Sequence, residues 1–210
     1  MKNKFFMWYF IIFGCVTFLA ACQDYSTKNE NLAEQEIISV LYDSLAKKIP
    51  PPPPNLHGLN IKDSLRILSQ YNSIRDSLKF EKQIVGIIPT MQPLESKLDI
   101  MDFNSSKREL IHRLNSLKEQ KPLNIAELRT LRSDSVVEFG EQHLREFSAD
   151  YYQINKLLSF SRISFNEAGN EAAVIASVGT SRLASFTAIY FFRRISDKWT
   201  IVDSKGLSMS

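Results

Sequence analysis

The chain has 210 residues, 44% of them hydrophobic, with 26 basic and 23 acidic side chains. This near balance of charge, without a basic stripe interleaved with aromatic residues, argues against nucleic-acid binding. The chain has only seven glycines and no G-x-G-x-x-G, Walker A or H-E-x-x-H motif, which argues against phosphate-cradling loops and a zincin-type metal site. A G-x-S-x-G elbow is absent too. The members of a Ser-His-Asp triad can lie far apart in a sequence, so that triad stays open.

The first 21 residues have the pattern of a secretory signal peptide. Lys2 and Lys4 supply a basic start, Phe5 to Ala21 carries no charged residue, and Ala20-Ala21 closes the run with small side chains. The uncharged run of 17 residues is at the short end of what spans a bilayer. An uncleaved signal anchor is therefore the alternative interpretation.

The tetrapeptide Leu19-Ala20-Ala21-Cys22 resembles the lipobox of bacterial lipoproteins, in which an aliphatic residue and two small residues precede a cysteine. The resemblance implies that Cys22 receives a diacylglyceryl group, that the chain is cut before it, and that the new amine is acylated. Two or three acyl chains hold a protein lastingly on a bilayer, because each buried methylene contributes about 0.8 kcal/mol. The other alternative is a structural cysteine at a helix end.

Removal of residues 1–21 would leave no free thiol in the mature chain. Cys15 departs with the leader, and Cys22 is blocked as a thioether. Without Lys2 and Lys4 the 26 basic residues become 24, against 23 acidic residues, which gives a net charge of +1. We therefore expect no disulfide, no cysteine-bound zinc and no thiol nucleophile.

The segment after Cys22 begins polar and predicts a tether over residues 22–35. Apolar residues at helical spacing predict an amphipathic helix over 31–49, which five consecutive prolines, Pro50 to Pro54, bring to an end. We interpret this stiff polyproline II segment as a spacer, the alternative being a docking motif for a proline-binding partner. The predicted organisation is a tether over 22–35, a helix and polyproline spacer over 36–59, and a single globular domain over 60–210.

The predicted globular domain starts with helices and short strands. Asn60 predicts the cap of a helix, and that helix has an apolar face of Ile61, Leu65, Leu68, Ile74 and Leu78. A short strand is predicted over 83–91, where the prolines place it at an edge or end it early. The remaining expectations are a helix opened by the capping box Ser106–Glu109 and ended at Lys121-Pro122, a shorter helix over 124–131, a strand over 136–139 and an irregular segment over 140–153.

Residues 157–203 predict four consecutive strands joined by short loops, at 157–165, 171–178, 185–195 and 198–203. Short connections between consecutive strands form an antiparallel meander. The run Ile189 to Phe192 is apolar on both faces, so helices must cover the sheet. The predicted fold is α+β, with N-terminal amphipathic helices packed on a C-terminal four-stranded antiparallel meander.

The C-terminal quarter resembles that of a family of uncharacterised lipoproteins from Bacteroidetes-type bacteria. The resemblance rests on SFSRISFN at Ser159 to Asn166, AAVIASV at Ala172 to Val178 and DKWTIV at Asp197 to Val202. Many members carry a Cys-Gly-rich segment where this chain has GTSRLAS, Gly179 to Ser185, without cysteine. The family implies a lipid anchor and a location but no activity. The KWTIV ending is also similar to the last strand of cystatin-like and nuclear-transport-factor-like cones.

Few residues suggest chemistry. Glu109 and His112 lie three residues apart on a predicted helix, a spacing that metal-binding bundles use in pairs, but only one copy is present and an exposed pair is the better interpretation. Glu141-Gln142-His143 is as weak a pattern, and Ser159 to Arg162 is interpreted as ordinary strand residues with Arg162 paired to a carboxylate. We predict lipidation at Cys22 and no catalytic, cofactor-binding or metal-binding residue.

Two functional hypotheses follow. The first is a non-enzymatic interaction or structural module of the cell envelope, tethered through Cys22 and contacting a protein partner there. We expect the periplasmic face of the outer membrane, because no acidic run of the kind associated with surface export follows Cys22. The second is a small-ligand-binding or hydrolytic domain with a cone-like sheet. A pocket lined by His, Asp or Arg would favour the second, and an exposed apolar patch would favour the first.

Overall fold

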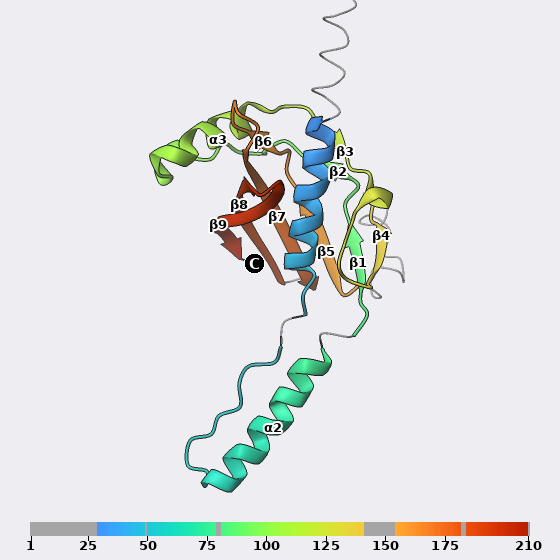
Figure 1. Ribbon diagram of the computed structural model, residues 1–210, viewed down its shortest axis with the longest axis vertical. Coiled ribbons are helices and arrows are strands. Elements are labelled where there is room, and N and C mark those ends of the chain that lie inside the picture. The colour runs from blue at the N-terminus through green and yellow to red at the C-terminus, as the bar shows by residue number, and fades with distance from the viewer. Residues whose placement is uncertain (1–28, 49, 79–80, 141–153, 182–183, 210) are drawn as a thin grey trace, which may run out of the picture.

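The computed structural model describes residues 29–48, 50–78, 81–140, 154–181 and 184–209. Cys15, Cys22 and the predicted segment 141–153 lie outside the described residues. Three helices over residues 29–45, 61–77 and 105–116 come before most of the strands, and the C-terminal strands pair antiparallel (Figure 1). This arrangement confirms the predicted α+β class.

One mixed sheet of seven strands forms the centre of the fold, in the order β4-β1-β5-β7-β8-β9 with β6 beside β7. Its strands are β1 (Ile84–Ile87), β4 (Ser135–Glu138), β5 (Lys156–Phe160), β6 (Ser164–Phe165), β7 (Glu171–Ser181), β8 (Ala184–Ile195) and β9 (Lys198–Met209). The antiparallel pairs β5–β7, β7–β8 and β8–β9 form the predicted meander. That meander is only part of the sheet, because β1 adds to it parallel to β5, and β4 parallel to β1.

The prolines near strand β1 predicted either an edge position or an early end, and the structure has the second. Strand β1 lies between β4 and β5, and Val85 and Ile87 are fully buried. The strand ends at Ile87, just before Pro89, as predicted. After the proline the chain continues as β2 (Thr90–Met91), which pairs with β3 (Lys121–Pro122). A proline just beyond a strand leaves the ladder bonds of that strand intact.

The helix over residues 29–45 covers one face of the sheet (Figure 1). Ile37, Ile38, Leu41 and Tyr42 on this helix are fully buried in the larger of the two hydrophobic clusters. Small side chains on that face of the sheet allow the helix to approach closely. They are Ala172, Ala176 and Ala188. Residues 29–35, which we had assigned to the tether, are helical and begin this layer.

The opposite face is covered by α3 (Ser105–Ser116) and the short 3-10 helix η1 (Ile100–Asp102). Leu110, Ile111 and Leu114 of α3 pack there against Ile189 and other sheet residues. Asn104 is the N-cap of α3, so the helix begins two residues before the cap that was predicted at Ser106. The helix predicted over 124–131 is only the 3-10 turn η2 (Ile125–Glu127), because Leu128 is already extended.

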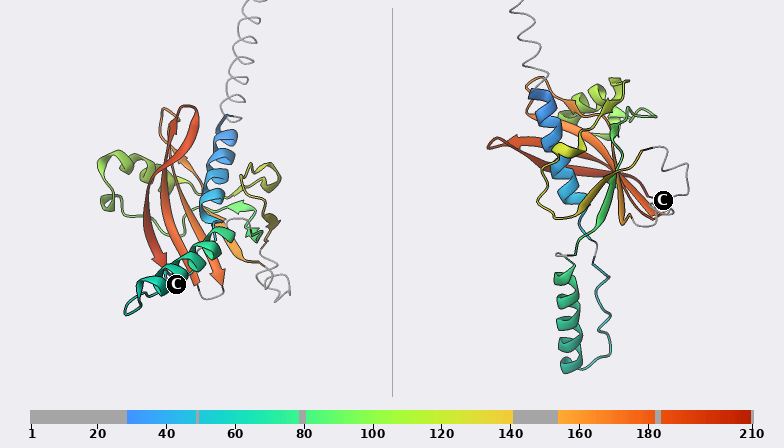
Figure 2. Two further views of the ribbon diagram at one scale, coloured as in Figure 1. Left: turned by 60° about the horizontal axis from the view of Figure 1, so that its bottom comes forward. Right: turned by 90° about the vertical axis from the view of Figure 1, so that its right-hand side faces the viewer.

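Helix α2 (Ile61–Ser77) does not cover the sheet as we expected. None of its residues is buried, and it projects from the rest of the molecule (Figures 1 and 2). Its predicted start is confirmed, since the side chain of Asn60 accepts a hydrogen bond from the Asp63 amide at 2.9 Å. Local signals therefore placed the helix correctly but not its packing.

A two-residue turn joins β8 to β9. Ser196 and Asp197 both have positive φ angles, 49° and 60°. This left-handed geometry suits a type I′ hairpin, whose twist matches that of the flanking strands. The turn brings Arg194 beside Trp199 in the ladder and starts the long C-terminal edge strand.

Candidate functional site

The candidate residues from the sequence do not assemble into one site. Cys22 and the Glu141–His143 triplet lie outside the described residues. Glu109 and His112 are exposed on α3, where Glu109 accepts a hydrogen bond from Arg113 at 3.0 Å. Over the described ranges no group of three or more His, Cys, Asp and Glu side chains could hold a metal ion.

The Ser159–Arg162 segment has a structural role. The Ser161 hydroxyl accepts from the Ile175 amide at 2.8 Å and donates to the Arg162 carbonyl at 2.7 Å. Arg162 donates to the backbone carbonyl of Glu119 at 2.6 Å, and not to the carboxylate that we expected. These bonds hold the bend between β5 and β6 against β7. The Ser161 hydroxyl is buried and engaged in both of its bonds.

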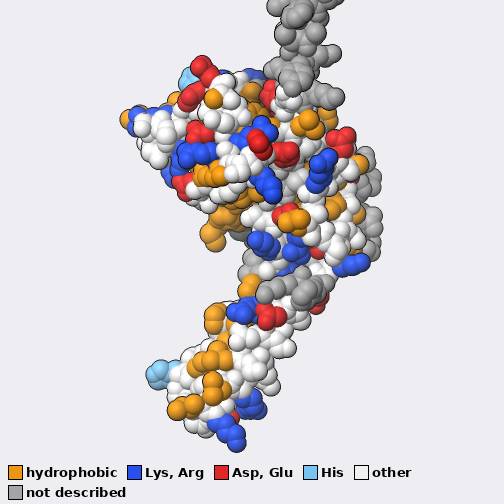
Figure 3. All heavy atoms as spheres, in the orientation of Figure 1, with side chains coloured by type: hydrophobic (Ala, Val, Ile, Leu, Met, Phe, Trp, Pro, Cys, Tyr) orange, Lys and Arg blue, Asp and Glu red, His pale blue; other side chains and the backbone are white. Residues whose placement is uncertain are grey.

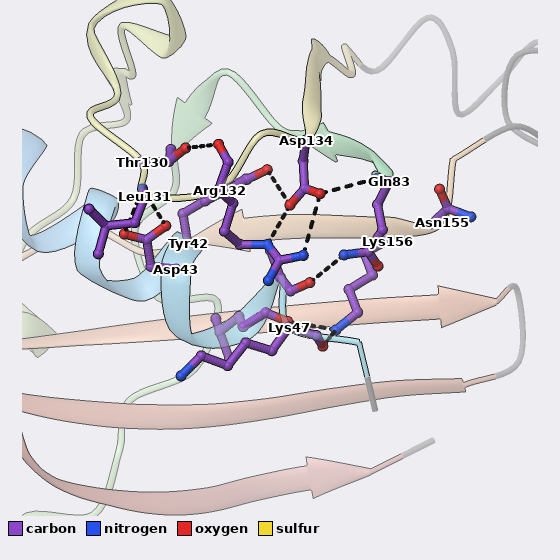
Figure 4. A network of polar contacts seen from close by, with 12 residues as sticks. Tyr42, Asp43, Lys47, Gln83, Thr130, Leu131, Arg132, Asp134, Asn155 and Lys156 are labelled. Carbon is purple, nitrogen blue, oxygen red and sulfur yellow. Dashed lines mark hydrogen bonds and ion pairs between the residues drawn. The ribbon is translucent and has the colours of Figure 1, made fainter. Parts of the chain in front are cut away.

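A network of polar contacts ties the first helix to the start of β4 (Figure 4). Asp134 has a side chain only 2% exposed and accepts from the Tyr42 hydroxyl at 3.3 Å, the Gln83 amide at 3.1 Å and the Arg132 guanidinium. Burial and the negative charge of Asp134 raise the pKa of Tyr42 above its usual range. Each of these groups has a partner, so the network joins three segments and offers no unengaged acid or base.

The same network closes the C-terminal end of the first helix (Figure 4). The buried Lys156 ammonium donates to the carbonyls of Leu45 and Lys47, and Gln83 donates to the carbonyl of Ala46 at 2.7 Å. Burial lowers the pKa of Lys156. A cation suits the carbonyl end of a helix, where the macrodipole is negative. Lys156 therefore stabilises the helix end, and its engaged ammonium is not presented as a nucleophile.

A cavity of about 770 Å³ lies at the other end of the first helix. Its charged lining is balanced, with Glu30 and Glu167 opposite Arg113 and Arg194. The Arg113 guanidinium already donates to Glu109 at 3.0 Å and to Glu167 at 3.2 Å. Among the described residues that line it, none is a histidine or an aspartate, and its only carboxylates are those of Glu30 and Glu167.

The arm, which we define as residues 50–78, carries exposed large hydrophobic side chains at Leu59, Ile61, Leu65 and Ile74. It comprises the proline-rich segment over 50–60 and α2, which run side by side away from the body (Figures 1 and 2). The Tyr71 hydroxyl donates to the Pro51 carbonyl at 3.1 Å and links α2 to the proline-rich segment. An ion pair between Lys48 and Glu81 joins its base.

Hydrophobic side chains gather along the arm instead of packing inside it (Figure 3). Ile61 is 81% exposed, Leu65 62% and Ile74 52%. Large apolar residues exposed singly are ordinary, whereas several on one helix mark an interaction surface. Sequence analysis found these side chains as an apolar face but assigned them to the core. The helix carries many serine and amide side chains, and the stiff proline run precedes it; these two features signalled its exposure.

Comparisons with models of known protein families, with curated proteins and with solved structures give no match for this chain. Within the described part of the chain, every helix is too short or too polar to cross a membrane. The candidate functional surface is therefore assigned from the geometry of the structure alone. We assign it to the arm, because the apolar side chains of α2 are exposed and have no role in the core of the body.

Proposed function

We propose that this protein is a lipid-anchored component of the bacterial cell envelope and that it is a non-enzymatic interaction module. In this proposal it belongs to the lipoproteins that its C-terminal sequence resembles. Acyl chains on Cys22 hold it at the periplasmic face of the outer membrane. The body is a rigid support, and the arm is the part that meets a partner. The exposed apolar side chains of α2 are the observation that carries the proposal.

The position of the arm supports the same assignment. The first described residues of the helix over 29–45 and the tip of the arm lie at opposite ends of the molecule (Figure 1). Six residues separate Cys22 from Asn29, and a fully extended chain spans at most about 3.5 Å per residue. An anchor at Cys22 keeps the N-terminal end of the body within about 25 Å of the lipid. The arm then points away from the membrane, toward partners in the periplasm.

A small-ligand-binding role is the second candidate, and the cavity of about 770 Å³ favours it. The guanidinium groups of Arg113 and Arg194 line this cavity together with the apolar side chains of Ile163 and Phe165. A cavity of this size suits a small molecule. Asn29 and Glu30 are among its lining residues, so it lies at the end of the first helix nearest to the proposed anchor.

The anchor is tested by expressing the native chain and Cys22→Ala in a bacterium that processes lipoproteins, followed by fractionation and intact mass measurement. We expect the native protein in the membrane fraction, starting at residue 22 and carrying the lipid mass, and the variant without either. If both forms stay uncleaved and membrane-bound, residues 5–21 are a signal anchor and the lipoprotein proposal is wrong.

The interaction surface is tested by chemical cross-linking in intact cells. We compare Leu65→Glu, which places a charge in the exposed apolar stripe, with Gln70→Glu, which places the same charge elsewhere on α2. Cross-linked complexes that persist in the second variant and disappear in the first support the arm as the interaction surface. Equal complexes in both variants contradict it.

A further inference from the structure

We propose that α2 is one strand of a parallel two-stranded coiled coil and that the partner of the arm is a second copy of this chain. This inference deepens the proposed function and rests on it, because the membrane anchor concentrates the two copies. In this proposal the exposed stripe of α2 binds the same stripe of a second copy and no other partner. The observations that carry it are the spacing of the stripe, its one amide, its charges and its place at the tip of the arm.

The stripe has the spacing of a heptad seam. Ile61, Leu65, Leu68, Asn72 and Arg75 alternate by four and three residues along α2. This is the d-a-d-a-d pattern of a coiled coil, with Leu65 and Asn72 at the a positions. Ile61 and Leu65 are 81% and 62% exposed, while Leu68 is half-buried.

The proline-rich segment covers the neighbouring face of α2 and leaves the seam open. Ile67 and Tyr71 are half-buried beside it, and the Tyr71 hydroxyl holds the Pro51 carbonyl. One side of the helix is therefore already packed. The prolines also stiffen the arm, which lowers the entropy lost when two arms pair.

Asn72 indicates what kind of partner the seam meets. Against an apolar groove of another protein, its amide would be buried without a partner, which costs free energy. Across a two-fold axis it meets the amide of its own copy, and one amide can donate while the other accepts. A single asparagine at an a position selects parallel, two-stranded pairing in register.

The charges of α2 are compatible with a parallel pair. The e positions are Lys62, Ser69 and Asp76, and the g positions are Ser64, Tyr71 and Leu78, so none of the e and g contacts sets two like charges against each other. Arg75 lies 3.7 Å from Asp76 within the chain. In a parallel pair each Arg75 faces the Arg75 of the other copy in one d layer, and Asp76 at the neighbouring e position of both copies offsets that repulsion.

The direction of α2 sets how two bodies would be arranged. The helix begins at the tip of the arm and runs back toward the body (Figure 1), so Ile61 is at its far end and Arg75 near its last turn. A two-fold axis along the arm directs both bodies, and both helices over 29–45, to the same side. Two copies anchored in one membrane have this arrangement, which an antiparallel pair does not provide.

The seam covers about two heptads, and a helix pair of that length is marginal in water. Tethering both copies to one surface raises their effective concentration and stabilises pairing without a new contact. We therefore expect dimers on the membrane and a concentration-dependent equilibrium once the protein is extracted.

Cysteine cross-linking of the full chain in native membranes tests this arrangement. Under mild oxidation, Leu65→Cys and Asn72→Cys are expected to form reducible dimers of twice the chain mass. Gln70→Cys is the matched control, because it is exposed on the face away from the seam. The chain without an added cysteine controls for dimers formed through Cys15 or Cys22. Adding Ile61→Glu to the Asn72→Cys chain should lower the dimer yield about tenfold, which is a loss of about 1.4 kcal/mol in pairing.

Several results would overturn the coiled coil. They are equal cross-linking at position 70, an adduct with a mass other than that of this chain, or co-expressed Ile61→Cys and Asn72→Cys chains linking to each other, as in an antiparallel pair. Fractionation of the same samples tests membrane attachment separately from pairing. Membrane-bound protein without cross-links overturns the dimer alone, whereas protein in the soluble fraction overturns the anchor. Sedimentation equilibrium of the full chain at raised concentration then measures self-association directly, and a monomer there overturns the dimer as well.

Discussion

The body and the arm each contain an amphipathic helix, yet the two helices have opposite environments. The helix over 29–45 buries Ile37, Ile38 and Leu41 completely, whereas α2 buries none of its residues. The first helix carries adjacent apolar residues that make a wide face, whereas the seam of α2 is narrow, is interrupted by Asn72 and leaves Ile67 and Ile74 outside it. A wide face suits a sheet and a narrow one suits another helix. The comparison shows that the width of an apolar face carries information about its partner.

The largest difference is expected from removing one leucine from each helix. Leu41→Ala in the body should lower the free energy of unfolding by about 3 kcal/mol, because it leaves a cavity in a filled core. The same change at Leu65 in the arm should alter it by less than about 0.5 kcal/mol, because that side chain is already in water. Urea unfolding of the two variants measures both values. Equal losses would mean that the arm packs on the body in solution.

Asp134→Asn is expected to have the next largest effect. The substitution keeps an acceptor for the Tyr42 hydroxyl but removes the charge opposite the Arg132 guanidinium, which is only 16% exposed. We expect a loss of about 2 kcal/mol in unfolding free energy, because a mostly buried cation is left without its counter-ion. Asp76→Asn, at an exposed ion pair of the arm, should cost less than about 0.5 kcal/mol. A similar small loss at both positions would show that solvent reaches the network of the body.

The buried Glu34 should make the unfolding free energy of the body depend on pH. Burial is the main reason that the pKa of Glu34 is raised above its usual value, although Lys121 opposes the shift. The folded state then holds the proton more tightly than the unfolded chain does. This contribution to stability is present at low pH and is lost as the pH rises through the raised pKa. The unfolding free energy of the native chain, minus that of Glu34→Gln, should therefore be larger at pH 4 than at pH 7. The opposite slope would mean that the ion pair with Lys121 outweighs burial.

Excision of the arm should have little effect on the body. Lys48 and Glu81 form an ion pair at its base, so a short Gly/Ser linker can replace residues 50–78. We expect the unfolding free energy to change by no more than about 1 kcal/mol, since loop length alone has a weak effect on stability. The shortened chain should also stay monomeric in sedimentation equilibrium at concentrations at which the full chain self-associates. If it does not fold, the arm contributes to the body in a way that its exposure does not reveal.

The smallest expected effect concerns the hairpin turn between β8 and β9. Asp197 adopts a φ of 60°, which glycine reaches without strain, and glycine is favoured at the second position of a type I′ turn. Asp197→Gly should raise the melting temperature slightly, corresponding to about 0.5 kcal/mol. The cost of removing its ion pair with Arg194 is small, because the two groups are 3.8 Å apart and exposed. A lower melting temperature would show that the aspartate side chain stabilises the turn.

Local sequence patterns determined the elements of this protein. Asn60 predicted the start of α2, the continuous apolar run Ile189 to Phe192 predicted a buried strand, and short loops between strands predicted the antiparallel pairing of β7, β8 and β9. These features depend on side chains a few residues apart, so one sequence suffices to find them. The lipobox-like Leu19-Ala20-Ala21-Cys22 is equally local, and the anchor that it predicts stays a prediction.

Only the tertiary structure decided which element each face meets. It placed β1 between β4 and β5, joined Asp134 to Tyr42 across 92 positions of sequence, and left Ile61 and Leu65 in solvent. Hydrophobic periodicity identifies an apolar face and its width but does not show whether another element covers that face, because burial depends on the shape and area of surfaces distant in the chain. The sequence alone therefore determined where α2 begins and which of its residues are apolar. The tertiary structure left those residues exposed, because other helices already cover both faces of the sheet. This exposure is what makes them available for a second copy.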